Sequence, residues 1–224
     1  MVTDDAEPVL AAGVREGWGV ALLCGTGSLA WGRNVRGEMA RVGGWGYLLG
    51  DEGSGYQLAC QGLRAALRAA DGRSEPTSLS ALLLNELGAA SPEQLVERVY
   101  GGPMTRRELA ALARVVLAAA EHDGAARQIV EEGAAAVAEM VAALVRRLAL
   151  VPGDYPLAMA GGLLIHHGGY RELVLNELAR RQVPPGTIAL VHQPVRGAVA
   201  LARELARGSL RWTSAAKASS PDLA

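Results

Sequence analysis

The spacing of apolar residues divides the chain into three consecutive parts. Short apolar runs separated by glycine-rich turns occupy 19–24, 29–34 and 39–44, and they predict a meander of three antiparallel strands. From about residue 54 to residue 150 the apolar residues recur at helical spacing instead. The last part predicts a strand at 155–162, a helix at 170–181, a strand at 186–191 and a helix at 194–206.

Turn and capping residues separate the helices expected in the middle part. Ser91 is followed by Pro92, a combination typical of a helix N-cap and the first helical position. The segment 123–150 has acidic residues early and Arg146-Arg147 near its end, as the helix dipole favours. We expect helices at 54–70, 78–88, 91–102, 105–122 and 123–150. The sequence therefore predicts an α/β protein with a meander, a helical block and a closing strand–helix–strand–helix segment.

Composition narrows the class of protein. The 224 residues are 50% hydrophobic and 20% charged, enough to bury a core, and the formal net charge of −1 gives no reason to expect nucleic acid as a partner. No apolar run has the length of a membrane span, and the first residues lack the basic-then-apolar order of a signal peptide. Cys24 and Cys60 form neither a zinc spacing nor a disulfide framework. We expect a cytoplasmic protein without a membrane partner and without a metal-ligating set of side chains.

Two glycine-rich turns are candidates for binding chemistry. Gly25-Thr26-Gly27-Ser28 follows an apolar strand, where several backbone N–H groups and a hydroxyl can point at one phosphate. The same residues also suit an ordinary hairpin turn, and no Walker lysine follows them. The second turn lies in "AGGLLIHHGGY" at 160–170, where adjacent His166 and His167 are expected in a solvated loop and not as a metal pair.

Five segments resemble one known family. "TDDA", "CGTGSLAWGR", "GGWGYLLGDEGSGYQL", "AGGLL" and "QPVRGAVALA" have the order and approximate spacing of the N-acetylglucosamine kinase family, over about residues 2–206. That family belongs to the superfamily of sugar kinases, heat-shock ATPases and actin. The resemblance implies a ribonuclease H-like ATPase domain with a mixed sheet, flanking helices and a helical insertion. It also implies phosphorylation of an amino sugar at its 6-hydroxyl with ATP and Mg²⁺. N-acetylglucosamine is the first candidate substrate, before glucosamine and N-acetylmuramic acid.

The resemblance implies a role for individual residues. Asp5 would be the catalytic base for the sugar hydroxyl, although Asp4 stands where the family has asparagine. Six further residues would bind the sugar or shape its site, and five would bind the nucleotide. The nucleotide set is Gly25, Thr26, Gly27, Gly161 and Gly162, and the sugar set is Asp5, Ser28, Gly44, Trp45, Gly46 and Asp51, while Glu52 would shape the turn into the following helix. The glycines would let backbone approach the ring, Trp45 would give an apolar wall, and Asp51 would accept hydrogen bonds from hydroxyls. Glu52 could equally be structural.

The resemblance also implies a division of the chain. Residues 1–18 would end a first lobe, residues 19–208 would form the second lobe with its helical block at 55–150, and residues 209–224 would be a tail. Nothing in the sequence matches the family's first phosphate turn. We therefore expect a second lobe that is a poor kinase, or an inactive one, by itself.

Two alternatives remain open at this stage. The activator ATPases of acyl-CoA dehydratases and benzoyl-CoA reductases share this fold and hold an iron–sulfur cluster between two subunits, with two cysteines from each. Cys24 and Cys60 could serve that purpose, although buried and inert cysteines are expected here. The chain could also be a non-catalytic remnant that binds sugar or nucleotide. A homodimer is a further expectation, since closing helices such as 194–206 commonly pair subunits in related kinases.

Overall fold

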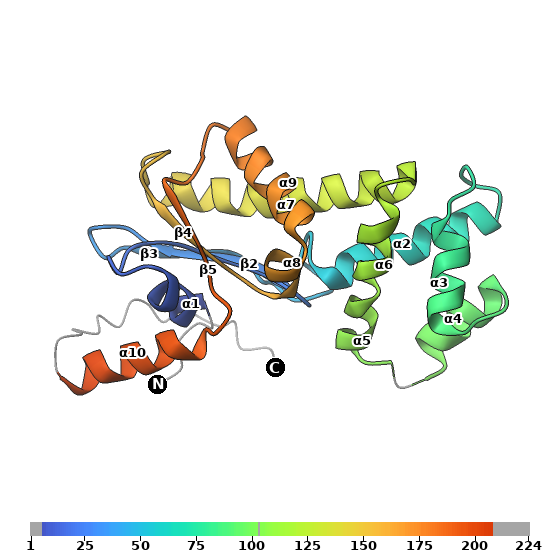
Figure 1. Cartoon of the computed structure of the whole chain (residues 1–224), viewed down its shortest axis with the longest axis horizontal. Helices are drawn as coiled ribbons and strands as arrows, with labels where there is room; N and C mark the ends of the chain where they lie inside the picture. Colours follow the sequence, from blue (N-terminus) through green and yellow to red (C-terminus); the bar gives the residue numbers. More distant parts are fainter. Residues whose placement is uncertain (1–5, 103, 208–224) are drawn as a thin grey trace, which may run out of the picture.

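One mixed sheet forms the centre of the structure, a computed structural model that describes residues 6–102 and 104–207 (Figure 1). The strand order is β3-β2-β1-β4-β5; the pairs β1–β2 and β2–β3 are antiparallel, and the pairs β1–β4 and β4–β5 are parallel. The strands are β1 (Gly19–Cys24), β2 (Ser28–Arg33), β3 (Met39–Gly43), β4 (Pro156–Ala160) and β5 (Thr187–Leu190). The predicted meander and both later strands are confirmed.

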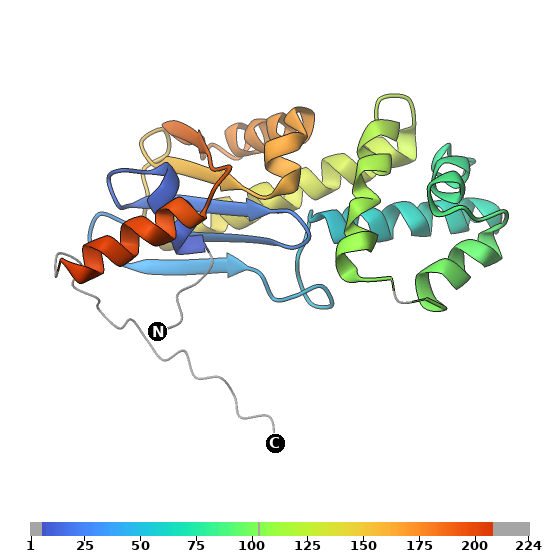
Figure 2. The same cartoon turned by 60° about the horizontal axis from the view of Figure 1, so that its bottom comes forward.

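Helices cover both faces of the sheet. They are α1 (Ala6–Gly13), α2 (Gly55–Ala70), α3 (Leu79–Leu87), α4 (Pro92–Tyr100), α5 (Arg106–Ala111), α6 (Ala113–Ala119), α7 (Gly124–Arg147), α8 (Gly162–His166), α9 (Gly168–Arg180) and α10 (Val195–Ala206). Figures 1 and 2 show α7 and α9 on one face and α1 and α10 on the other. Helices α2 to α6 form a block that extends beyond one end of the sheet. No helix of the described residues is long and apolar enough to cross a membrane.

The period-two alternation of the strands explains the two hydrophobic cores. In β1, Val20 and Leu22 pack with the helices of the α7 and α9 face, whereas Ala21 packs with α1. In β4, Met159 faces the first core and Ala158 faces the second. On the α1 face, α10 approaches closely because Gly197 has no side chain: a Cβ there would lie 1.9 Å from the carbonyl oxygen of Pro8.

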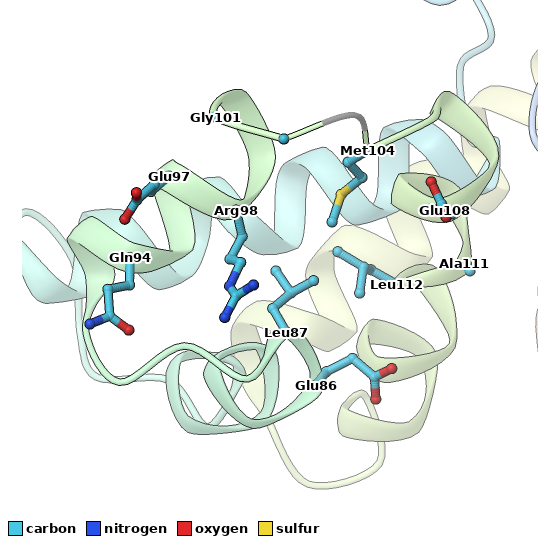
Figure 3. A pocket seen from close by; sticks show the side chains of 11 residues that line it. Glu86, Leu87, Gln94, Glu97, Arg98, Gly101, Met104, Glu108, Ala111 and Leu112 are labelled. Carbon is cyan, nitrogen blue, oxygen red and sulfur yellow. The ribbon is translucent and has the colours of Figure 1, made fainter.

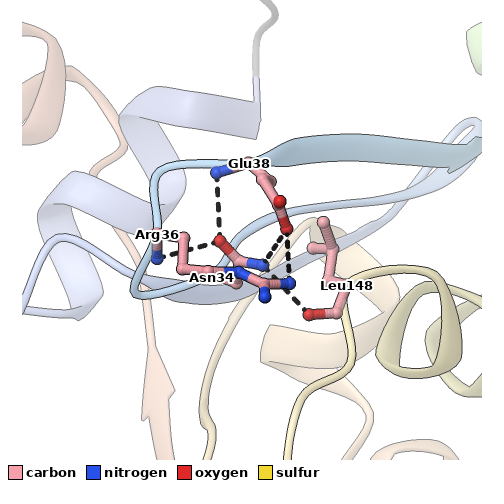
Figure 4. Close-up of polar contacts among 4 residues, drawn as sticks. All are labelled: Asn34, Arg36, Glu38 and Leu148. Carbon is pink, nitrogen blue, oxygen red and sulfur yellow. Dashed lines mark hydrogen bonds and ion pairs between the residues drawn. The ribbon is translucent and has the colours of Figure 1, made fainter.

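Two buried polar residues join distant segments. Asn34 donates a hydrogen bond to the carbonyl oxygen of Leu148 over 3.1 Å and accepts the backbone N–H groups of Arg36 and Glu38, which ties the β2–β3 hairpin to the end of α7 (Figure 4). Asp123 is the N-cap of α7 and accepts the N–H of Ala126 over 2.9 Å.

The same aspartate also holds the start of α3. Its carboxylate accepts the hydroxyl of Thr77 and both the hydroxyl and the N–H of Ser78. Burial by itself would raise the pKa of Asp123, but the backbone and hydroxyl hydrogen bonds outweigh it and lower that pKa to about 2. Asp123 therefore fixes the helical block to the helix that covers the sheet.

Two sequence predictions differ from the structure. The single helix expected at 105–122 is two helices, because the N–H of Leu112 bonds three residues back to Leu109 and interrupts the regular ladder. The solvated loop expected around the two histidines is only partly correct: His166 is exposed but is the last residue of α8, and His167 is the one non-helical residue between α8 and α9. A short helical turn forms there because Gly161, with φ of 98°, reverses the chain immediately after β4.

Candidate functional site

Two glycine turns meet where the parallel strands β1 and β4 end. The turn Gly25–Gly27 joins β1 to β2 and is closed by a hydrogen bond from the N–H of Gly25 to the carbonyl oxygen of Gly27 over 2.9 Å. The turn after β4 lies against it, since a Cβ on Gly25 would be 3.3 Å from the nitrogen of Gly162. A Cβ on Gly161 would lie only 2.3 Å from the carbonyl oxygen of Cys24. The contact therefore requires glycine, and it brings both predicted nucleotide segments to one edge of the sheet.

Asp51 lies beside the first of these turns. It has a φ of 59°, which is uncommon for a residue with a side chain, and only 5% of its surface is exposed. Its carboxylate accepts the N–H of Ser28 over 3.2 Å, and a Cβ on Gly27 would lie 2.8 Å from its Oδ2. The hydroxyl of Ser28 donates to the carbonyl oxygen of Glu52 over 2.7 Å. The turn and the Asp51-Glu52 pair are thus held together.

The carbonyl oxygen of Gly53 connects this pair to two other elements. It accepts the hydroxyl of Tyr170, at the start of α9, over 2.6 Å, and the thiol of Cys24 over 3.4 Å. A Cβ on Gly53 would lie 2.2 Å from the carbonyl oxygen of Gly133 in α7, so only glycine fits. The sequence contains no local signal for Tyr170, because its partner is 117 residues away.

Burial keeps both of these donors protonated. The pKa of the Tyr170 hydroxyl is raised well above its ordinary value by burial first and by Cys24 second. Burial, with a smaller effect of the Asp51 charge, raises the pKa of the Cys24 thiol. Cys60, half-buried on α2, has a pKa raised by burial. Burial thus favours the protonated thiol at both cysteines.

A cleft of about 440 Å³ opens beside the first glycine turn. Its walls come from the two turns, from α5 and α6 of the helical block, and from the two histidines. The lining residues are Gly25, Thr26, Gly55, Arg107, Ala110, Ala111, Ala113, Arg114, Gly162, Leu163, His166 and His167. None of the described residues on this wall is acidic, so the cleft is suited to an anion such as phosphate.

A larger groove of about 590 Å³ adjoins the cleft and shares Arg114 and His167 with it. This groove runs between α6, α7 and α9, and much of its wall is apolar. It includes Leu117, Val130 and Leu173. Burial, and secondarily the neighbouring His166, lower the pKa of His167. Charged residues, Glu121, Arg127 and Glu131, line the groove as well. A groove with an apolar wall that continues into a basic cleft is an arrangement that a nucleotide, with its flat base and its phosphates, would fill.

The glycine–tryptophan loop lies at the surface of the structure. Trp45 is 75% exposed, while Gly44 and Gly46 both have left-handed φ angles. Tyr47 is held instead: its ring packs on Tyr56 at 5.3 Å, and the guanidinium of Arg106 lies 5.6 Å from its centre. The structure thus unites Ser28 and Asp51 with the glycine turn but leaves Trp45 at the surface.

Another hollow, of about 840 Å³, lies within the helical block between α3, α4 and α5 (Figure 3). Acidic, basic and apolar side chains line it together, including Glu97, Arg98 and Met104. None of the predicted site residues borders it. It therefore does not belong to the site at the glycine turns.

Asp5, the predicted base, lies outside the described residues. The residue that follows it, Ala6, is buried at the start of α1. Arg107 and Arg114 line the cleft but were not predicted, because the family segments lie elsewhere in the sequence. Only the packing of the helical block brings these arginines to the glycine turn.

The fold and site define an ATPase domain of the actin-like sugar-kinase class. A solved structure from Chromobacterium violaceum, described as a candidate N-acetylglucosamine kinase, has a TM-score of 0.69 and 27% identity, covering 89% of this chain and 64% of that one. The chain itself belongs to the BadF/BadG/BcrA/BcrD ATPase family, whose sequence model matches residues 1–202.

Two curated relatives are also similar to this chain. One is the N-acetylmuramic acid/N-acetylglucosamine kinase of Clostridium acetobutylicum, 38% identical over 165 residues, which are 73% of this chain and 54% of that protein. The other is the N-acetyl-D-glucosamine kinase of Dictyostelium discoideum, 31% identical over 206 residues, which are 90% of this chain and 64% of that protein. The chain thus spans between half and two thirds of the length of each.

Proposed function

We propose that this chain is the nucleotide- and sugar-binding part of an ATP-dependent amino-sugar kinase that phosphorylates N-acetylglucosamine at its 6-hydroxyl. The observation that carries the proposal is the contact between the two glycine turns, with the Asp51 carboxylate held beside them and a basic cleft in front. The names of the two curated relatives support an amino sugar as the substrate.

The nucleotide would bind along the cleft and the adjoining groove. Backbone N–H groups of Gly25–Gly27 and the Thr26 hydroxyl would bind the phosphates, while Gly161 and Gly162 would lie against the adenosine. The cleft fits this ligand because its charged lining residues are all basic among those that the structure describes. The continuation between α6 and α9 gives the apolar wall that a purine needs.

The sugar would bind on the other side of the Gly25–Gly27 turn. Asp51 would accept hydrogen bonds from ring hydroxyls, and Ser28 with the Gly44 and Gly46 backbone would surround the ring. The exposed Trp45 would cover an apolar face of the ring once the sugar is bound. Asp5 would orient the 6-hydroxyl and accept its proton, a task for which position matters more than strong basicity, because phosphoryl transfer has a largely dissociative transition state.

Mg²⁺ would neutralise phosphate charge in such a reaction. Among residues 6–102 and 104–207 no group of three or more histidine, cysteine, aspartate or glutamate side chains is placed to hold a metal ion. We therefore assign no magnesium ligand to this part of the chain. The proposal assigns residues 19–208 to the second lobe of the kinase and residues 1–18 to the end of the first.

The test is a coupled ADP-release assay with MgATP and N-acetylglucosamine, run beside Asp5→Asn and Asp51→Asn. The proposal is supported if Asp5→Asn abolishes ADP release and if Asp51→Asn strongly raises the KM for the sugar. Asp71→Asn is the matched control, because Asp71 pairs with Arg73 on an exposed surface. If the chain alone shows no turnover, calorimetry must still detect binding of MgATP and of the sugar. A chain that binds neither is not the domain we propose.

The activator-type alternative receives some support from the name of the matching family, which describes the BadF/BadG/BcrA/BcrD proteins as ATPases. The cysteines speak against it, because Cys24 is fully buried and donates its thiol to a backbone carbonyl. An absorbance band in the visible range after anaerobic purification would favour the iron–sulfur activator. Binding of sugar or ATP that never leads to ADP release, even in a chain extended upstream, would indicate a non-catalytic binding protein.

A further inference from the structure

The helical block supplies positive charge to the cleft at the glycine turn. Arg107 comes from the first turn of α5 and Arg114 from α6, and both line the cleft together with Gly25 and Thr26. Neither arginine belongs to the segments from which the nucleotide site was predicted. The insertion therefore forms one wall of the site and is not only a structural addition to the sheet.

Arg107 is the arginine whose charge is available. Within the described residues its guanidinium takes part in no hydrogen bond or ion pair, and Arg114 is paired with Glu86. The adjacent Arg106 is turned toward the ring of Tyr47, with 5.6 Å between its guanidinium and the ring centre. The three arginines of α5 and α6 thus differ in their surroundings, and among the described residues Arg107 is the one that lines the cleft without an ion-pair partner.

The nearest acidic residue in the sequence does not neutralise Arg107. Glu108 forms a capping box with Thr105: its carboxylate accepts the N–H and the hydroxyl of Thr105, both over 2.7 Å. Glu108 lines the separate hollow within the helical block and not the cleft. The capping box also fixes the first turn of α5, which keeps the Arg107 backbone in place at the cleft.

The position of the two arginines along the site differs. Arg114 lines both the cleft and the adjoining groove, whereas Arg107 lines the cleft but not the groove. A nucleotide with its base in the groove and its phosphates at Gly25–Gly27 would therefore pass Arg114 before it reaches Arg107. In that arrangement Arg107 would be the arginine nearer to the last phosphate of a triphosphate.

We propose that Arg107 binds the terminal phosphate of the nucleotide and makes the site selective for a triphosphate over a diphosphate. This inference rests on the proposed function, since it assumes a nucleotide in the cleft. The guanidinium is suited to the task because its planar set of N–H donors matches phosphate oxygens. After transfer the terminal phosphate is gone, so the contact would be lost and release of the diphosphate would be easier.

The experiment compares the affinities of MgATP and MgADP by calorimetry in the wild-type chain, Arg107→Ala and Arg107→Lys. We expect Arg107→Ala to weaken MgATP binding roughly tenfold, as loss of one charge-assisted hydrogen bond would, and to change MgADP binding by less than about threefold. Arg107→Lys should restore part of the loss. Arg73→Ala, in the same helical block but on an exposed surface ion pair, is the matched control and should bind both nucleotides as the wild type does.

The outcomes separate the two proposals. If the wild type binds MgATP and Arg107→Ala binds it equally well, the role of Arg107 is refuted while the proposed function stands. An equal loss of MgATP and MgADP affinity in Arg107→Ala would refute the assignment to the terminal phosphate. If the wild type binds no nucleotide, both proposals fail. Since Arg107 is exposed, circular dichroism should show an unchanged fold in every variant.

Discussion

Removal of the Tyr170 hydroxyl is the perturbation whose effect the structure defines best. Only 2% of Tyr170 is exposed, and its hydroxyl donates to the carbonyl oxygen of Gly53 over 2.6 Å. Tyr170→Phe keeps the ring and deletes this donor alone. Among the residues that the structure describes, the carbonyl oxygen then retains only the thiol of Cys24 at 3.4 Å, which is a weak donor at a long distance.

The expected cost follows from that geometry. Leaving a buried carbonyl oxygen without its main donor lowers the free energy of unfolding by about 1–3 kcal/mol. Because the Cys24 thiol still donates weakly to this oxygen, we expect a loss of about 2 kcal/mol. For a domain of this size that corresponds to a fall in Tm of roughly 4–8 °C. The raised pKa of the Tyr170 hydroxyl means that the donor is present throughout the neutral pH range, so pH 7 is a suitable condition.

The assay is urea unfolding followed by far-ultraviolet circular dichroism, beside Tyr155→Phe as the matched control. Tyr155 is also fully buried and donates its hydroxyl to a backbone carbonyl, that of Val183, over 2.7 Å. It lies away from the glycine turns. Both variants should lose similar stability, but only Tyr170→Phe should weaken binding of MgATP or sugar, because Gly53 adjoins the Asp51-Glu52 pair.

Two results would refute this reasoning. A Tyr170→Phe protein within about 0.5 kcal/mol of the wild type would show that the hydrogen bond contributes little to the fold. Equal effects of Tyr155→Phe and Tyr170→Phe on ligand binding would show that Tyr170 acts only through general stability. Binding should be measured at a temperature where both variants are fully folded.

Three further predictions concern other parts of the chain. Gly161→Ala should lower the free energy of unfolding by at least about 2 kcal/mol and abolish nucleotide binding, because its Cβ would contact backbone at a φ of 98°. Gly162→Ala is the control and should fold normally, because its Cβ meets open space. Thermal unfolding of the two variants distinguishes them. Asp123 has a folded pKa of about 2, below its unfolded value near 3.8, so its stabilisation is complete above about pH 4 and is lost as pH falls toward 2. Acid titration of unfolding should show a loss of about 2 kcal/mol that Asp123→Asn lacks. Light scattering should report a dimer that Val199→Glu converts to monomer, because Val199 is an exposed apolar residue of α10; a monomeric wild type would exclude the pairing.

Local sequence signals were sufficient for most of the fold. The strand meander follows from short apolar runs between glycine turns, and Ser91 and Thr105 each cap a helix where the sequence predicts one. Where the prediction was wrong, the backbone geometry of single residues decided. The N–H of Leu112 bonds to Leu109 and interrupts the helix expected at 105–122, and the turn at Gly161 places α8 where a loop was expected.

The residues of the candidate site likewise fall into those that the sequence could predict and those that it could not. Gly25–Gly27, Gly161 and Asp51 could be named from the sequence, because they lie in short segments that resemble those of a known family. At Gly161 the structure adds a physical reason, since its φ of 98° and its close approach to the Cys24 carbonyl oxygen require glycine. Arg107 and Tyr170 could not be named from the sequence, because exposed arginines and buried tyrosines are common and neither carries a local pattern. The hydrogen bond of Tyr170 spans 117 residues, and Arg107 reaches the cleft only through the packing of α5 beside the glycine turn. The sequence by itself determined the elements and the glycine turns, since these depend on backbone preferences within a few residues. Only the tertiary structure decided which charges surround those turns, since that depends on contacts between segments far apart in the chain.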